Sequence, residues 1–173
     1  MSTAEYLAFV PLLLYGIGLA DILGEWKRFF DPKAMFLPYT LFTIGLTEIA
    51  IYNVFVYVNV VSQLEHTSYL QYLSFLTAPF LFLITVSAFT PEKEAETKAY
   101  FVSRLRLFSV LLVLFITSHL LYAGEEFTSA TLFRGVAIAV LVLLAVFRNM
   151  WLVYVFFVVW LVTLFMRINV SVG

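Results

Sequence analysis

Six long runs of apolar residues, almost free of charged side chains, divide the chain. A hydrocarbon core about 30 Å thick requires about 20 helical residues per crossing, and each run approaches or exceeds that length. Alternation with a period of two, the pattern of a membrane β-barrel, does not occur in the runs. The sequence therefore predicts an all-α, polytopic integral membrane protein, a bundle of six transmembrane helices at about residues 6–23, 38–61, 69–89, 91–123, 131–147 and 150–166.

Two of the predicted helix starts carry local signals. Pro38 fits the first turn of helix 38–61, where its missing N–H costs nothing. Thr90, Pro91 and Glu92 indicate an N-cap, a proline at the first helical position and an acidic first turn. The fourth helix is therefore expected to begin at residue 91, with residues 91–104 projecting into water as a cytoplasmic extension.

The basic residues predict the orientation. Arg134 and Arg167 lie on one side of the predicted membrane. The other eight of the 10 lysine and arginine residues fall in or beside the first, third and fifth connections: Lys27, Arg28, Lys33, Lys93, Lys98, Arg104, Arg106 and Arg148. Basic loops stay in the cytoplasm, so both termini are expected outside.

The composition indicates a membrane protein rather than a soluble one. Of the 173 residues, 63% are hydrophobic and 12% are charged, whereas soluble domains carry about 25% charged residues. The six crossings use most of the chain, so residues 1–173 are expected to form a single transmembrane domain. The chain has no cysteine, which excludes disulfides and thiolate-bound metals.

One carboxylate, Glu48, lies near the middle of helix 38–61, where an ionisable group costs at least about 2–3 kcal/mol. It shares a helical face with Gly45, Tyr52 and Asn59, so these residues form a polar stripe. The functional interpretation is a proton or cation site. The alternative is a protonated carboxyl group that hydrogen-bonds a neighbouring helix and stabilises the bundle.

The histidine of the fourth helix is the second candidate. His119 lies in the outer half of helix 91–123, at a depth similar to those of Glu48 and Asn53. A Glu48–His119 pair could exchange a proton. The alternative is a histidine bonded to a backbone carbonyl.

Helix 69–89 carries Gln71, Ser74 and Thr77 and then Pro79. Proline removes a backbone hydrogen bond, and freed carbonyls beside small hydroxyl groups can line a cavity or coordinate a cation. Local packing within a kinked helix is the alternative.

Three charged residues follow one face at the cytoplasmic end of the first helix. Asp21, Glu25 and Arg28 are spaced at i, i+4 and i+7, which predicts a solvated helix end with internal ion pairs, joined by Arg104 or Arg106. The alternative is the inner mouth of a conduction path that ends at Glu48.

Two pairs of small residues predict close contacts between helices. Gly16 and Ala20 in the first helix, and Gly135 and Ala139 in the fifth, have the small-xxx-small spacing.

The stretch from Pro79 to Phe101 contains a mid-helix proline, the sequence Ala-Phe-Thr-Pro-Glu at 88–92, an acidic linker and a Tyr-Phe pair. Together with Gly-Leu-Ala-Asp-Ile-Leu at 18–23, it resembles a group of small bacterial multi-pass inner-membrane proteins that has no assigned activity. The resemblance implies location in a bacterial inner membrane and no catalytic residues.

The leading functional hypothesis is a small oligomeric channel or transporter-like protein for protons or small cations. The alternative is a non-catalytic scaffold or sensor subunit of a larger complex, with a cytoplasmic partner at residues 91–104; an intramembrane enzyme is the third hypothesis. Motifs such as HExxH and GxSxG are missing, so we expect no enzyme activity, cofactor or metal. The expected partners are the lipid bilayer and further copies of the chain, and no nucleic acid.

Overall fold

The computed structural model describes residues 3–61, 68–92, 95–122 and 129–167. These residues form six α-helices and one short 3-10 helix, which confirms the all-α prediction for the described part of the chain. The elements are α1 (Thr3–Glu25), η1 (Trp26–Phe29), α2 (Leu37–Val61), α3 (Tyr69–Phe89), α4 (Thr97–Tyr122), α5 (Ser129–Phe147) and α6 (Met150–Arg167).

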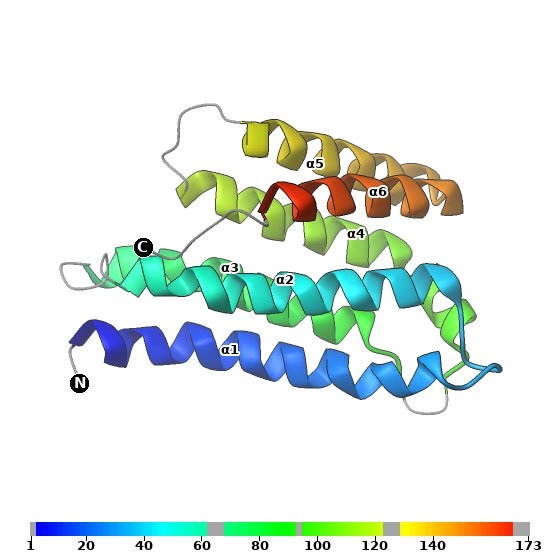
Figure 1. Ribbon diagram of the computed structural model, residues 1–173, viewed down its shortest axis with the longest axis horizontal. Coiled ribbons are helices and arrows are strands. Elements are labelled where there is room, and N and C mark those ends of the chain that lie inside the picture. Colours follow the sequence, from blue (N-terminus) through cyan, green and yellow to red (C-terminus); the bar gives the residue numbers. More distant parts are fainter. Residues whose placement is uncertain (1–2, 62–67, 93–94, 123–128, 168–173) are drawn as a thin grey trace.

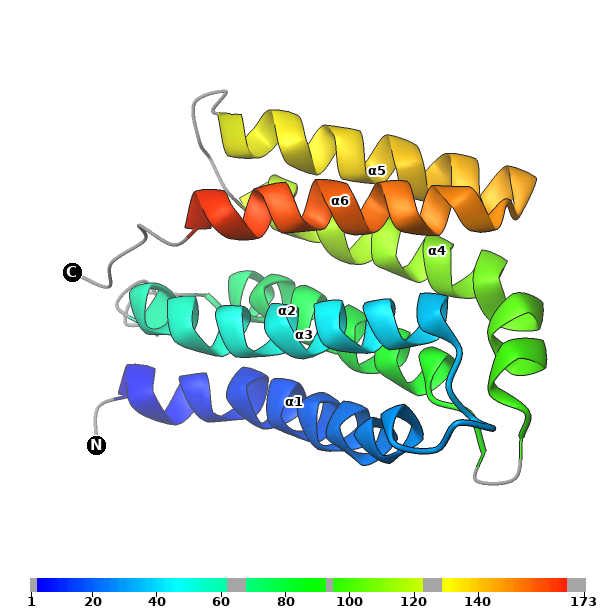
Figure 2. The ribbon, with the colours of Figure 1, turned by 45° about the vertical axis from the view of Figure 1, so that its right-hand side comes forward.

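Successive helices run in opposite directions along one axis (Figure 1). The helix α1 packs against α2 and α3, α3 packs against α4, and the α5–α6 hairpin joins this group through α5 on α4 and α6 on α2 (Figure 2). One end of the bundle holds η1, the end of α1 and the start of α2. The end of α3, the start of α4 and the turn between α5 and α6 lie at this same end. We call this the η1 end of the bundle, and the other the far end.

Four helices are long and apolar enough to cross a membrane. Their spans are Glu5–Phe29, Leu37–Tyr57, Tyr69–Phe89 and Thr97–His119. The apolar stretches of α5 and α6, Thr131–Phe147 and Met150–Met166, are shorter. The four long spans indicate a membrane protein, and the many exposed leucine, isoleucine, valine and phenylalanine side chains on the outer faces of the helices are compatible with lipid.

Aromatic side chains fill the core toward the η1 end. The ring of Tyr39 stacks on Phe89 with centroids 4.5 Å apart, and Phe42 meets Phe108 edge to face at 4.8 Å. Phe156 of α6 stacks on Phe42 at 5.2 Å. Aromatic pairs of this geometry contribute about 0.5–1.5 kcal/mol each beyond the area they bury. The cluster therefore fixes α2, α3, α4 and α6 relative to one another.

The predicted start of the fourth helix at residue 91 is wrong, because α4 begins at Thr97. Thr90 ends α3 instead of capping α4: its backbone is extended, and both its N–H group and its hydroxyl group donate to the carbonyl of Val86. The first turns of α4 also do not project into water, because Phe101 and Leu105 are buried in the core. The packing of Phe101 and Leu105 in the core thus outweighs the local capping signal at Thr90 and Pro91.

The small-xxx-small pairs are not where the helices approach most closely. Gly16 and Gly135 are exposed, and a Cβ atom added at either would meet nothing within 4 Å. A Cβ atom at Gly18 would lie 2.8 Å from the ring of Phe82, which is fully buried. Gly18 is thus the glycine that lets α1 approach α3.

Substitution of Gly18 by leucine should destabilise the fold, since the added side chain overpacks the contact with Phe82. We expect a loss of about 1–3 kcal/mol in unfolding free energy, measured by denaturation of the purified protein in detergent. The matched control, Gly16→Leu, lies two residues away on an exposed face and should change stability far less. Equal effects of the two substitutions would contradict this account of the α1–α3 contact.

Candidate functional site

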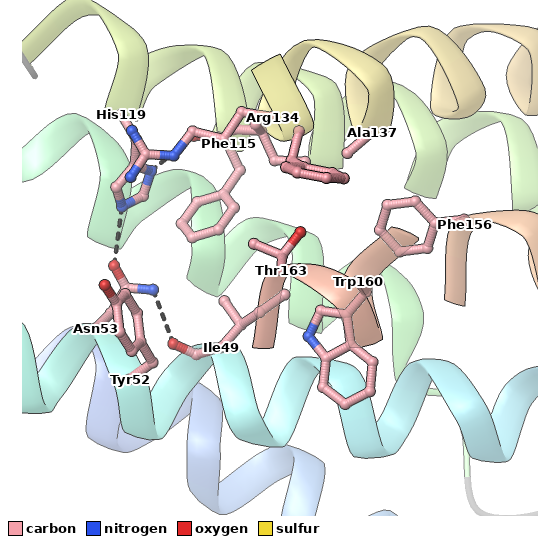
Figure 3. A pocket seen from close by; sticks show the side chains of 12 residues that line it. Ile49, Tyr52, Asn53, Phe115, His119, Arg134, Ala137, Phe156, Trp160 and Thr163 are labelled. Atoms are coloured by element: carbon pink, nitrogen blue, oxygen red, sulfur yellow. Dashed lines mark hydrogen bonds between the residues drawn. The ribbon is translucent and has the colours of Figure 1, made fainter. Parts of the chain in front are cut away.

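A cavity of about 90 Å³ lies between the α5–α6 hairpin and helices α2 and α4 (Figure 3). We call it the chamber. It belongs to the half of the bundle toward the far end, since it is built by the later turns of α2, α4 and α6 and the first turns of α5. Twelve side chains line it: Ile49, Tyr52, Asn53, Phe115, Ile116, His119, Phe133, Arg134, Ala137, Phe156, Trp160 and Thr163.

His119 binds α4 to α2 at one side of the chamber. Its Nε2 atom lies 2.9 Å from Oδ1 of Asn53, and its Nδ1 atom lies 3.0 Å from the carbonyl oxygen of Phe115 (Figure 3). The amide of Asn53 is oriented by its NH₂ group, which donates to the carbonyl of Ile49 over 2.7 Å. Both ring nitrogens of His119 therefore face oxygen acceptors. Both contacts can be hydrogen bonds when each nitrogen carries a proton.

Glu48 has a different partner. The indole Nε1–H of Trp160 donates to its Oε2 atom over 3.0 Å, which links α2 to α6. Gly45, one turn away on α2, leaves room for this indole, because a Cβ atom there would already be 3.8 Å from it. Glu48 is half-buried, and its carboxylate faces α6. The sequence could not identify Trp160 as the partner, since spacing within one helix does not reveal which helix it meets.

Arg134 enters the chamber from the second turn of α5. Its side chain is half-buried, and Figure 3 shows the guanidinium group directed toward the ring of His119. No acidic side chain among the residues that the structure describes forms an ion pair with it. The sequence offered a signal, an arginine inside an apolar run, but its interpretation was limited to orientation.

The described lining of the chamber therefore carries positive charge and no carboxylate. Arg134 supplies the charge and Tyr52 adds a phenol, whereas the ring nitrogens of His119 and the hydroxyl of Thr163 already have partners within the protein. Within the described ranges, no group of three or more histidine, cysteine or acidic side chains could hold a metal ion. The arrangement is chemically suited to a small polar or anionic group.

The candidates on α3 do not line the chamber. Gln71 forms a capping box with Ser68 at the start of the helix, and the hydroxyl groups of Ser74 and Thr77 donate to backbone carbonyls of α3 itself. Pro79 is buried, and α3 continues through it. These observations agree with the local-packing alternative.

Asn59 falls within α2, but its side chain lies outside the described residues.

The internal ion pair predicted at the end of the first helix is confirmed, and Asp21 is exposed as expected, but the prediction that Glu25 and Arg28 are solvated is wrong, because both are buried. They form an ion pair, and Glu25 also accepts from the hydroxyl of Tyr39 over 2.8 Å. The guanidinium group of Arg28 donates to the hydroxyl of Thr97 and to the carbonyls of Glu92 and Ala95 at 3.2–3.4 Å.

This network ties α1 and η1 to α2 and to the segment that leads into α4. It replaces the expected pairing with Arg104 or Arg106, both of which are exposed, as is Asp21. The charged groups of this network are buried and have partners within the protein. They therefore favour a structural role for the network over the inner mouth of a conduction path.

Substitution of Arg28 by methionine should destabilise the protein strongly, since it leaves the carboxylate of Glu25 buried without its cation. A broken buried ion pair costs about 3–5 kcal/mol, which thermal denaturation in detergent would register. The exposed Arg106→Met serves as the control for loss of one positive charge. A change no larger than that of the control would show that the pair does not stabilise the fold.

No protein-family model, curated protein or solved structure matches the chain. The resemblance to small bacterial inner-membrane proteins therefore stays a prediction.

Proposed function

We propose that the protein is a six-crossing membrane protein that binds a small molecule in the chamber and acts as a non-catalytic sensor or ligand-binding subunit. The observation that carries this proposal is the chamber itself. Polar side chains from all four of its helices converge on it, whereas the core toward the η1 end is filled with aromatic rings. Concave sites with a few convergent polar groups in an apolar lining are typical of ligand-binding sites.

The connection between ligand and response runs through the α5–α6 hairpin. A molecule in the chamber touches Arg134 and Thr163 of the hairpin and Asn53 and His119 of the remaining bundle. The binding free energy of that molecule therefore depends on how the α5–α6 hairpin packs against the rest of the bundle. By thermodynamic linkage, binding of the molecule shifts the equilibrium between the packing arrangements of the hairpin. A partner protein that contacts the hairpin would register the change.

Six crossings are favoured over four by the length and chemistry of the hairpin. The 17 apolar residues of each helix span about 26 Å, slightly less than a hydrocarbon core of about 30 Å, a mismatch that bilayers accommodate at modest cost. Leu141 and Leu144 are fully buried, while Val146, Phe147 and Trp151 expose large apolar surfaces. A position in the cytoplasmic or bacterial inner membrane, with basic loops inside, stays a prediction.

Cysteine labelling can test this topology, because the chain has no cysteine of its own. With six crossings, single cysteines at Lys33 and Arg148 should react with a membrane-impermeant maleimide only after the cells are permeabilised. A cysteine at Glu5 should react in sealed cells. Labelling of the position 148 variant in sealed cells, with position 33 protected, would show that the hairpin does not cross.

Permeation of protons or cations past Glu48 receives less support from the geometry. The carboxylate of Glu48 accepts a hydrogen bond from Trp160. The described lining of the chamber includes the positively charged Arg134 and no acidic side chain. Aromatic side chains occupy the core between Glu48 and the η1 end. Homo-oligomer formation and a cytoplasmic partner at residues 91–104 stay predictions.

The ligand-binding proposal requires that small molecules reach the chamber. A cysteine that replaces Thr163, which lines it, should react with a small thiol reagent in membranes, and a cysteine at the fully buried Ser109 should not. The ratio of the two labelling rates, measured by mass spectrometry, is expected to exceed about tenfold. Equal and negligible labelling of both positions would overturn the proposal, because the chamber would then be closed.

A further inference from the structure

We infer that the ligand of the chamber carries an oxyanion, a phosphate, sulfate or carboxylate group, which is held by Arg134 beside a protonated His119. This inference rests on the proposed function and names the chemical class of its ligand.

Arg134 carries a charge that no described acidic side chain balances. A guanidinium group stays protonated at any physiological pH. Its half-buried side chain reaches into a cavity lined mostly by apolar residues, and no acidic side chain in the described part of the chain pairs with it. Charges removed from water are usually paired, since the loss of hydration is costly. A ligand oxyanion would complete the pair, and the planar fork of arginine matches such a group with two parallel hydrogen bonds.

The hydrogen bonding of His119 favours its protonated form. Its two ring nitrogens face Oδ1 of Asn53 and the carbonyl of Phe115. A flip of the Asn53 amide would place Oδ1 against the carbonyl of Ile49, so the bond between Asn53 and Ile49 fixes an acceptor toward the imidazole. Both contacts are hydrogen bonds at once only when the ring is an imidazolium.

The two groups together create the need for an anion. Figure 3 shows the guanidinium group of Arg134 directed toward the ring of His119, so that protonation of the ring places two positive charges in one small cavity. Their repulsion is strong in a poorly hydrated site, and an oxyanion between them removes it. Binding of the anion and protonation of His119 are therefore coupled, and each favours the other.

Among the described residues that line the chamber, the other groups leave this coupling to His119. On α2 the titratable neighbour is Tyr52, on α5 the charged neighbour is Arg134, and α6 contributes Thr163 and Trp160, neither of which titrates in the accessible range. Glu48 is engaged by Trp160, and α3 contributes no residue to the chamber. Affinity for the oxyanion should thus rise as the pH falls and histidine becomes protonated.

The cavity volume restricts the size of the bound group. About 90 Å³ holds a few water molecules, each of which takes about 30 Å³ in the liquid. It is well below the ~300 Å³ or more of sites for drug-sized ligands. The bound part is therefore a small free anion or the headgroup phosphate of a lipid whose chains remain in the bilayer.

Protection of a single cysteine at position 163 against a thiol reagent tests the inference on the full-length protein in nanodiscs. One arm adds sulfate to phosphatidylcholine nanodiscs, and the other replaces part of the phosphatidylcholine by phosphatidylglycerol. Both anions keep a constant charge between about pH 5.5 and about pH 8, so any pH dependence reports on the protein, where histidine changes charge near about pH 6.5.

We expect saturable protection in at least one arm, tighter at the lower pH. Addition of Arg134→Gln should weaken it about tenfold or more, while Arg106→Gln, which removes an exposed arginine of α4, should leave it unchanged. Arg134→Lys keeps the charge without the fork and should give intermediate affinity, which guards against a variant that fails to fold. His119→Gln should abolish the pH dependence.

The outcomes separate the two proposals. Protection by sulfate would identify a free oxyanion as a sufficient ligand, and protection by phosphatidylglycerol alone would identify a lipid headgroup; both support the inference. The inference of an oxyanion ligand would be overturned if the cysteine at position 163 reacts but neither anion protects it. It would also be overturned if protection is equally strong with and without Arg134→Gln. In both cases the chamber would remain a binding site. A cysteine that never reacts would overturn the proposed function itself.

Discussion

Polar groups inside a hydrocarbon solvent must find their partners within the protein, and in this molecule helix α2 meets that requirement for most of the bundle. Tyr39 donates to Glu25 at the end of α1, and Thr47 accepts from Trp26 of η1. Glu48 accepts from Trp160 of α6, and Asn53 contacts His119 of α4. Each described polar link between α2 and its neighbours thus goes to a different element, which fixes rotation and depth where apolar packing alone is permissive.

The two ends of α2 have different characters. Near the η1 end, the hydroxyl of Tyr39 donates to Glu25 among closely packed aromatic rings. Toward the far end, the links to α4 and α6 form two sides of the chamber, and Arg134 supplies charge without a described acidic partner. The polar side chains of the chamber are thus held on helices that pack against a filled aromatic core, which is the kind of support that binding sites need.

Much of the fold follows from the apolar runs. The number of helices and the bounds of α2, α3, α5 and α6 agree closely with the prediction, because apolar length and turn residues are properties of the local sequence. The start of α4 was wrong because Thr90 and Pro91 are local signals that the contacts of Arg28 and Phe101 override. The buried state of Glu25 was missed for the same reason: its partner Tyr39 is 14 residues away in another helix.

The site was predicted in part. Depth along the helices places Glu48, Asn53 and His119 at one level, and in the structure Asn53 and His119 line the chamber while Glu48 contacts Trp160. Depth does not specify rotation, so the sequence left open whether His119 pairs with Glu48 or bonds to a backbone carbonyl. The structure pairs Glu48 with Trp160, and it places His119 against the backbone carbonyl of Phe115 and the side chain of Asn53. The place of Arg134 in the lining of the chamber was not predicted, because its positive charge was interpreted only as a topological signal.

The unequal length of the helices has a consequence for the surrounding lipid. The apolar stretches of α5 and α6 are shorter than the spans of the other four helices. If the hairpin crosses the bilayer, a membrane thick enough for α1–α4 must thin along the flank formed by α5 and α6. Lipid phosphates on that flank would sit closer to the midplane than elsewhere around the protein, at the level of the first turns of α5.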